Sequence, residues 1–441
     1  MARWLAASAV ALAAAACGGS PEGQGTETAG SEAPAVAPTI SQALSASPTP
    51  PALNPAVMSP HCPATLDMGS KGGIADEVMA DGRTVPVQQL LLNRGPWLVT
   101  SDLTVTQPYA AGSLIAWESR PNVPRSVSTV RALDCSSAES WDLASRAYDN
   151  GQVDVPVTDG ESVVFGEWAS RGPENGWWEI RRFDPSEKTQ STLLTSAEFL
   201  EERGAVGRQP LIPEPCVAGG RMLTWLKTAE PDVTNMLWVD LQTGARTMLT
   251  SFVDGGVQAG SHCGLWANRG VYLLRDLSIG RWTWDVWLFD ANSGEKRRLT
   301  NAVEAQTTYE LPAISTGKVA YVETRNPDGN GNYILWLQDL QTGKRIAMTN
   351  TITGGQGNIT KVAMNDTWLA WITTQKIHLV RLAEPDKQYE IAKPGTAGSV
   401  LQLDGSVFQF EMSADSIVWK TSTSEKTGAP IDERLYWLRL P

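Results

Sequence analysis

Seven polar residues occupy the same place in seven repeated units of this chain, each shortly before an apolar segment: Gln107, Asp154, Glu214, His262, Glu310, Lys361 and Glu411. Gathered at one mouth of a fold, such groups could bind a ligand. Two carboxylates, such as Glu214 and Glu310, could also act as general acid and base on a glycosidic bond. Hydration of a central channel is the simpler interpretation. The choice depends on the elements that position these residues.

Aromatic residues form a second candidate site. The chain contains 18 tryptophans. Four of them lie in or beside predicted long loops, with an arginine and a tyrosine nearby: Trp177, Trp178, Trp282, Trp284, Arg281 and Tyr333. Flat apolar rings beside hydrogen-bonding groups suit the faces of sugar rings, so this pattern favours recognition of a glycan or peptidoglycan. Packing within the sheets is the alternative. Five other tryptophans recur within the apolar segments and are predicted to be core: Trp117, Trp168, Trp225, Trp371 and Trp419.

Metal sites and nucleic-acid binding find little support in the sequence. The three histidines lack the spacing of a catalytic zinc site: His61, His262 and His378. One loop places oxygen ligands at alternate positions, as calcium loops do, but without the downstream acid: Asp328, Asn330 and Asn332. A glycine-rich hairpin loop is the alternative there, and no other cofactor is expected. The net charge of −12 argues against nucleic acid as a partner, because such proteins need a basic face.

The first residues predict export. Residues 1–16 combine Arg3 with an apolar stretch too short to span a bilayer as a helix, which is typical of a signal peptide. The run from Ala14 to Cys17 resembles the lipobox of bacterial lipoproteins, with alanine at position 14 where leucine is usual. The resemblance implies cleavage before Cys17 and its lipidation, which would anchor the protein to the bacterial cell envelope, at the outer membrane or cell surface. A plain secretory signal is the alternative.

Residues 17–60 predict a disordered tether. They contain eight prolines and eight alanines, and no lysine, arginine or aromatic residue. Such a stretch cannot bury enough apolar surface to offset the entropy lost on ordering. A flexible linker of this length reaches roughly 35–40 Å. The folded part, residues 61–441, is therefore expected to stand clear of the membrane.

A repeat of about fifty residues organises the folded part. Seven segments rich in β-branched and aromatic residues start at intervals of 49, 59, 49, 48, 49 and 49 residues. The segments are SLIAWES from Ser113, SVVFGEW from Ser162, RMLTWLK from Arg221, GVYLLRD from Gly270, KVAYVET from Lys318, TWLAWIT from Thr367 and SIVWKTS from Ser416. A further strand candidate precedes each segment, and a polar loop and another strand follow most of them. Such regular spacing predicts a repeat architecture.

A turn of the form D-x-x-[TS]-G then leads to the last strand of the unit. The clearest copies are DLQTGARTMLT from Asp240, DANSGEKRRLT from Asp290 and DLQTGKRIAMT from Asp339, with a looser copy from Asp184. The glycine supplies a positive φ, and the aspartate can accept backbone hydrogen bonds within the turn. The turn predicts a hairpin, and each unit is interpreted as four antiparallel strands.

Four-stranded units of this length cannot bury both faces alone, so they are predicted to stack around an axis as an all-β, seven-bladed β-propeller. The repeat pattern over roughly residues 97–441 resembles that of TolB-type β-propellers. The resemblance implies the fold and places a ligand face at one mouth of the axis. Function does not follow from it, because this scaffold hosts translocation-associated proteins, peptidase caps, lyases and ligand-binding lipoproteins alike.

The ends of the chain suggest how the ring closes. The chain stops after the third strand of the seventh unit, so that unit needs an outer strand from elsewhere. The stretch from Val87 to Ser101 has suitable apolar spacing and is predicted to complete the last blade. The long interval of 59 residues holds a predicted helical insertion at residues 196–209.

Four cysteines remain after Cys17: Cys62, Cys135, Cys216 and Cys263. An exported chain favours two disulfides. Pairing of Cys216 with Cys263 is plausible because both lie in inner-strand segments of neighbouring units, and it leaves Cys62 for Cys135. The sequence alone leaves three pairings open.

The combined pattern favours a lipid-anchored, non-catalytic propeller that recognises or scaffolds a partner at its axial face. An envelope protein complex or a glycan is the expected partner. The alternative is a carbohydrate-active enzyme, a lyase or glycosidase, that uses the acidic residues at the mouth of the axis.

Overall fold

The computed structural model describes residues 71–91, 97–100, 105–119, 127–147, 152–170, 176–196, 215–227, 234–252, 263–275, 283–305, 307–325, 332–350, 352–353, 359–373, 376–392, 406–412, 415–422 and 433–441. All of them belong to one of the two units into which the chain divides, Pro48–Pro441. The predicted signal peptide (1–16), the tether (17–60) and the insertion after Ser196 lie outside the described residues.

Seven sheets follow one another along this unit, and the strands of each repeated unit pair antiparallel. The first three are β4 (Val105–Ala111), β5 (Leu114–Ser119), β6 (Val127–Asp134) and β7 (Glu139–Ala147); β8 (Gln152–Thr158), β9 (Val163–Ser170), β10 (Gly176–Asp184) and β11 (Thr189–Thr195); and β12 (Cys216–Ala218), β13 (Arg221–Lys227), β14 (Thr234–Asp240) and β15 (Arg246–Phe252).

The fourth and fifth sheets are β16 (Cys263–Trp266), β17 (Arg269–Arg275), β18 (Trp284–Asp290) and β19 (Glu295–Arg298); and β20 (Thr307–Ile314), β21 (Lys318–Arg325), β22 (Asn332–Asp339) and β23 (Arg345–Ala347), with β24 (Ile352–Thr353) also on β22. The sixth contains β25 (Ile359–Met364), β26 (Trp368–Thr373), β27 (Lys376–Arg381) and β28 (Gln388–Ala392). The seventh contains β29 (Ser406–Met412), β30 (Ser416–Ser422) and β31 (Glu433–Arg439).

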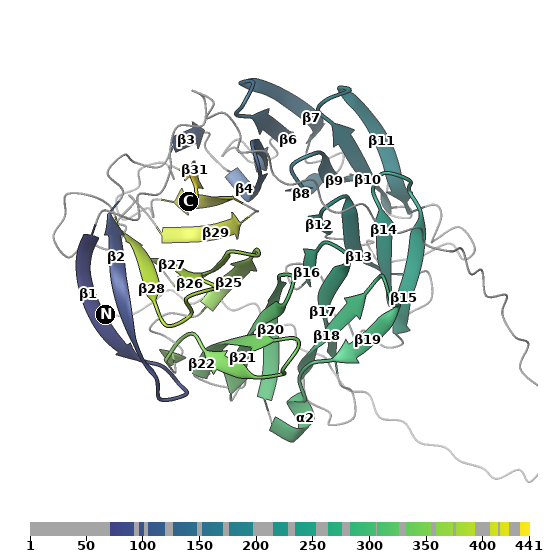
Figure 1. Cartoon of the computed structure of the whole chain (residues 1–441). Helices are drawn as coiled ribbons and strands as arrows, with labels where there is room; N and C mark the ends of the chain where they lie inside the picture. The colour runs from purple at the N-terminus through teal and green to yellow at the C-terminus, as the bar shows by residue number, and fades with distance from the viewer. Residues whose placement is uncertain are drawn as a thin grey trace, which may run out of the picture. The chain divides into compact units, whose positions relative to one another are not determined.

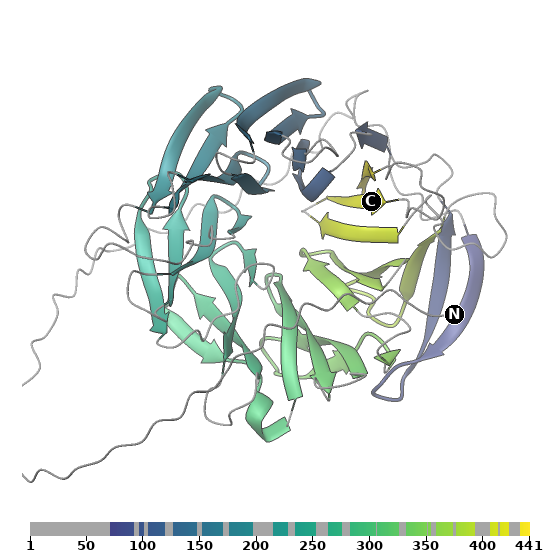
Figure 2. The same cartoon turned by 180° about the vertical axis from the view of Figure 1, so that it is seen from behind.

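The sheets are the blades of a propeller (Figures 1 and 2). The first strand of each blade contacts the first strand of the next, and β29 of the seventh blade contacts β4 of the first, so the ring is closed. The predicted all-β fold with seven blades is confirmed. In the described part of the chain the only helix is α2 (Ala302–Ala305), and no helix there is long and apolar enough to cross a membrane.

The hydrophobic core lies between the blades, as expected of sheets that cannot bury both faces alone. Seven clusters of buried residues form, and each joins two neighbouring blades; the cluster between the fourth and fifth blades also includes Met79 and Val85 of the β1–β2 hairpin. Starting between the first and second blades and following the ring, a large member of each cluster is Phe165, Trp178, Trp238, Tyr321, Trp371, Trp419 and Trp437. Four of the five tryptophans predicted to be core are buried, and the side chain of Trp168 lies outside the described residues.

An N-terminal strand closes the ring, as predicted. The strand β3 (Trp97–Thr100) pairs antiparallel with β31 as the fourth strand of the seventh blade. It is shorter than the stretch proposed from the sequence. Val87 instead belongs to β2 (Thr84–Leu91), which pairs parallel with β28 and adds the hairpin of β1 (Lys71–Val78) and β2 to the sixth blade. The apolar pattern of residues 87–101 therefore serves two neighbouring sheets.

The D-x-x-[TS]-G turns join the third and fourth strands. The carboxylate of Asp240 accepts hydrogen bonds from the backbone amides of Gln242 and Thr243, at 2.9 and 2.8 Å, and Gly244 has a φ of 71°. The turns at Asp290 and Asp339 repeat this arrangement. This confirms the predicted role of both residue types.

The corresponding turn of the first blade has Ala138 at a φ of 59°. An L-residue pays a steric cost in this region that glycine does not. We expect Ala138→Gly to raise the free energy of unfolding by about 0.5–1 kcal/mol in urea denaturation. Gly244→Ala is the matched control and should lower stability by a similar amount, because no atom lies within 4 Å of the added Cβ. A less stable Ala138→Gly variant would contradict the prediction.

Candidate functional site

The inner strands at the axis of the ring are irregular, and several strand pairs at its rim are irregular too. The pairing register between first and second strands shifts in five blades, at Thr106/Tyr109, Asp154/Val157, Glu310/Ala313, Ile359/Lys361 and Val407/Gln409. Such bulges redirect side chains and are common beside binding sites. In three of the five the bulge contains a proline, which cannot donate to the ladder: Pro108, Pro156 and Pro312. The candidate residues Glu310 and Lys361 adjoin two of these bulges.

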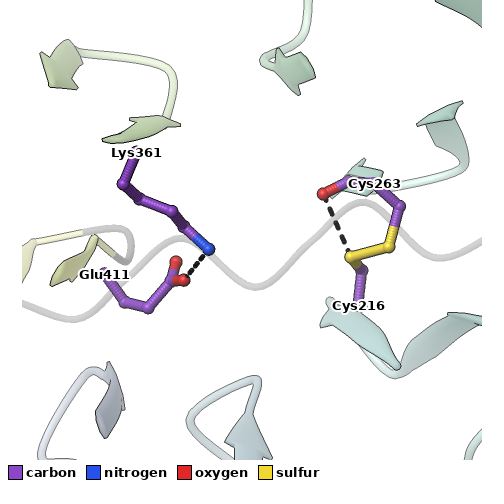
Figure 3. The surroundings of a disulfide bond; sticks show 4 residues. All are labelled: Cys216, Cys263, Lys361 and Glu411. Carbon is purple, nitrogen blue, oxygen red and sulfur yellow. Dashed lines mark hydrogen bonds and ion pairs between the residues drawn. A yellow bond between two sulfur atoms is a disulfide. The ribbon is translucent and has the colours of Figure 1, made fainter. Parts of the chain in front are cut away.

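Lys361 and Glu411 form an ion pair between the inner strands of the sixth and seventh blades (Figure 3). The lysine Nζ lies 5.8 Å from the ring centroid of Tyr109 on β4 of the first blade, and the Tyr109 hydroxyl donates a hydrogen bond to the Glu411 carboxylate. The side chains of Lys361 and Glu411 are only 20% and 14% exposed. The three residues, which we call the axial triad, tie three successive inner strands together.

Opposing effects act on the carboxyl group of Glu411. Burial raises its pKa, because removal from water disfavours the charged form, while the charge of Lys361 and the hydrogen bond from Tyr109 oppose that rise. The lysine is therefore the main group that keeps a charge on Glu411 tolerable. The triad offers a ligand both hydrogen-bond donors and acceptors with little net charge.

Removal of the lysine should expose this dependence. We expect Lys361→Met to lower the free energy of unfolding at pH 7 by about 2–3 kcal/mol, somewhat less than for a fully buried pair. The loss should shrink as the pH falls through the raised pKa of Glu411 in the folded protein, and it should be smallest below the unfolded value of 4.5, where the group is neutral in both states. Thermal unfolding between pH 4 and pH 8 measures this. The double variant Lys361→Met/Glu411→Leu is the control and should recover most of the stability; equal losses in both variants would contradict the prediction.

Glu310 lies on β20, on the inner strand of the fifth blade, and is partly buried. Burial raises the pKa of its carboxyl group. Above the unfolded value of 4.5 the folded protein therefore holds this proton more tightly than the unfolded chain does, and stability falls as the pH rises through the folded pKa.

A neutral side chain at position 310 should remove this penalty. We expect Glu310→Gln to raise the melting temperature at neutral pH, and the difference from wild type to vanish below about pH 4.5, where both forms are uncharged. Thermal melts across that range test it. A Glu310→Gln variant that is less stable than wild type at pH 7 would show that the carboxylate is stabilised by a favourable interaction.

A disulfide joins two inner strands on the opposite side of the axis from the axial triad. Cys216 on β12 and Cys263 on β16 are bonded, with their Cα atoms 6.2 Å apart, so the predicted pairing is confirmed. Figure 3 shows this disulfide and the Lys361–Glu411 pair pointing toward each other from opposite blades. Cys135 is disulfide-bonded as well, and Cys62, the partner predicted for it, lies outside the described residues.

Two of the tryptophans proposed for glycan binding are buried. Trp178 is 1% exposed on β10 and Trp284 is 4% exposed on β18, each within a cluster between blades. Their assignment as ligand contacts is corrected: both pack the core, because they belong to the third strands and not to the loops before them. Tyr333 is partly buried on β22 and packs against the cluster between the fifth and sixth blades. The side chain of Trp177, and the residues Arg281 and Trp282, lie outside the described residues.

Other candidates also fall outside the described part of the chain: Cys17, Glu214, His262, Asp328, Asn330 and the side chains of Gln107 and Asp154. Asn332 of the calcium hypothesis is the first residue of β22 and pairs with Arg325 in the sheet register. Among the described residues, no three histidine, cysteine, aspartate or glutamate side chains gather to hold a metal ion.

Two features of the inner and second strands were not predicted from the sequence. Tyr109 follows the bulge of the first blade, and its aromatic side chain on an inner strand was the available signal. The second feature is a set of buried glutamates at the sixth position of three second-strand segments: Glu118, Glu167 and Glu323. Glu167 pairs with Arg146 of the preceding blade and with Arg181 at 3.1 Å. The pair with Arg146 links the first and second blades.

Comparison of the sequence with protein-family models and with curated proteins finds no match. The fold resembles solved propellers at low identity. The propeller domain of the trilobed protease from Pyrococcus furiosus shares 10% identity at a TM-score of 0.49, over 77% of this chain and 94% of that one. An oligogalacturonate lyase in complex with manganese shares 11% sequence identity at a TM-score of 0.49, and the match covers 86% of this chain and 98% of that one. TolB from Acinetobacter baumannii shares 15% sequence identity at a TM-score of 0.37, and the match covers 63% of this chain and 62% of that one.

Proposed function

We propose that this chain is an exported, lipid-anchored propeller that binds a protein partner or a glycan at its axial face without transforming it. The observation that carries the proposal is the axial triad. Lys361, Glu411 and Tyr109 already satisfy one another, so the site presents a fixed set of donors and acceptors. Preorganised polar groups of this kind favour binding, because little order is lost when the ligand arrives.

Export and anchoring rest on separate support. Disulfides persist in oxidising compartments outside the cytosol, which agrees with the Cys216–Cys263 bond. Anchoring through Cys17 is proposed from the lipobox-like sequence. Metabolic labelling with a fatty acid tests it: wild type should carry label and partition into detergent, and Cys17→Ser should do neither.

A carbohydrate-active enzyme remains the second candidate, and one observation favours it. A glutamic acid with a raised pKa is what a general acid needs at neutral pH, and Glu310 has one. The proposed second carboxylate, Glu214, lies outside the described residues.

Affinity electrophoresis in gels that contain cell-wall or acidic polysaccharides separates the two functions. A binding module should be retarded by one polysaccharide and leave its chain length unchanged. An enzyme should release reducing ends or unsaturated products, and Glu310→Gln should stop that release while retardation persists. For a protein ligand, envelope proteins crosslinked to the wild type should be lost in the Lys361→Met/Glu411→Leu variant, which keeps the fold but not the triad.

A further inference from the structure

We propose that the outer edge of β1 binds an extended, basic segment of a partner protein as an added strand. The strand β1 ends the six-stranded sheet of the sixth blade, and no described strand pairs with its outer edge. It lies at the rim of the ring, away from the axis (Figure 1). Its binding is therefore independent of the proposed axial function.

The exposed residues of β1 make this edge suitable for a partner. Every residue from Gly73 to Val78 is exposed. Ile74 and Val78 are 63% and 60% exposed, and they are among the few large apolar side chains in the described residues that are so open to solvent. Soluble proteins usually blunt such edges, so an open and partly apolar one indicates an interaction site.

The outward backbone groups of β1 pair with no other strand in the described part of the chain, and they form a regular array. The amide of Met79 donates to the carbonyl of Arg83 at 2.7 Å, and the register continues without a shift as far as Ile74. In an antiparallel pair, successive residues alternate between facing the partner strand and facing away. The N–H and C=O groups of Ile74, Asp76 and Val78 therefore face outward, where an added strand would meet them.

The hairpin is held firmly enough to act as a template. Arg83 in its turn pairs with Asp386 at 2.6 Å, and the carboxylate of Asp81 accepts a hydrogen bond from the Ala347 amide at 2.9 Å. Ala80 donates to the carbonyl of Thr349 at 2.9 Å. The turn is thus fixed to both the fifth and the sixth blades, and little order has to be gained on binding.

Charge decides between a second copy and a different partner. The regular stretch from Ile74 to Val78 carries Asp76 and Glu77 and no lysine or arginine. Two copies paired edge to edge would bring four carboxylates together, which opposes self-association. Ile74, Asp76 and Val78 share one face of the strand, because every second residue does. The complementary segment has the pattern apolar, any, basic, any, apolar.

Fluorescence anisotropy with the full chain tests this proposal. The probe is a labelled peptide, Thr-Val-Thr-Lys-Thr-Val-Thr, with blocked ends. We expect saturable binding that Asp76→Lys weakens by about tenfold or more, as does replacement of the peptide lysine by aspartate. The acidic peptide should bind better to the Asp76→Lys protein than to wild type. Asp76→Pro should also weaken binding, because it removes an outward N–H while leaving the pairing with β2 intact.

Matched variants guard against non-specific effects. Ile74→Thr should weaken binding, whereas Met248→Thr, which removes another exposed apolar side chain on the outer strand β15, should not. Unchanged melting temperatures show that these surface variants fold. The proposal is overturned if the basic peptide fails to bind wild type, or if Asp76→Lys and Asp76→Pro bind it as wild type does. A dimer in light scattering that Asp76→Pro disrupts would also overturn it, since the occupant would then be a second copy.

Discussion

Trp419→Ala should lower the free energy of unfolding by about 3–5 kcal/mol, the largest effect of any single substitution considered for this chain. The indole is fully buried on β30, between the sixth and seventh blades. It packs in one cluster with Phe410 and Trp368, and its ring stacks on Tyr436 with centroids 5.7 Å apart. Truncation to alanine loses the transfer free energy of the indole and leaves a cavity that neighbouring sheets cannot close.

Urea denaturation followed by circular dichroism measures the loss. Trp287→Ala is the control: this tryptophan is only partly buried on β18, so its truncation should cost clearly less. Equal costs at the two positions would contradict the prediction, because burial at the interface would then not set the cost.

Loss of the Cys216–Cys263 disulfide should destabilise the propeller by about 4 kcal/mol. The two cysteines are 47 residues apart, and a crosslink that closes a loop of this size restricts the unfolded chain by roughly that amount. The bond also joins the inner strands of the third and fourth blades, so its loss weakens one junction of the ring.

The double variant Cys216→Ser/Cys263→Ser avoids a stray thiol and leaves the bond of Cys135 unaffected. Its unfolding midpoint in urea should fall well below that of wild type under non-reducing conditions. Addition of a reductant should then lower the wild type toward the variant. A double variant as stable as wild type would show that packing alone holds these blades together.

Much of the fold could be predicted from the sequence because it depends on local sequence patterns. The recurring apolar segments and the turn at Asp240 each depend on residues close together in the chain, so spacing and turn chemistry were enough to predict strands, hairpins and seven blades. The repeat made a bond between Cys216 and Cys263 plausible, because both lie in inner-strand segments of neighbouring units, but only the structure chose it from three possible pairings. The outer strand at Trp97 followed from a blade that lacked one.

The candidate site depended on the tertiary structure. Tyr109 and Glu411 come from opposite ends of the propeller, and only ring closure brings the hydroxyl to the carboxylate. Trp178 could be either a loop or a core residue until the start of its strand was known.

The sequence by itself determined the repeat and the class of fold, and it predicted a polar residue near the axis for each blade. The tertiary structure decided which side chains meet at the axis, that Val87 joins the sixth blade through a parallel strand, and that no strand among the described residues pairs with the outer edge of β1. The physical reason is that a repeat specifies each blade through contacts near in sequence. Contacts between the last blade and the first join residues that are far apart in the sequence, so no local sequence pattern predicts them.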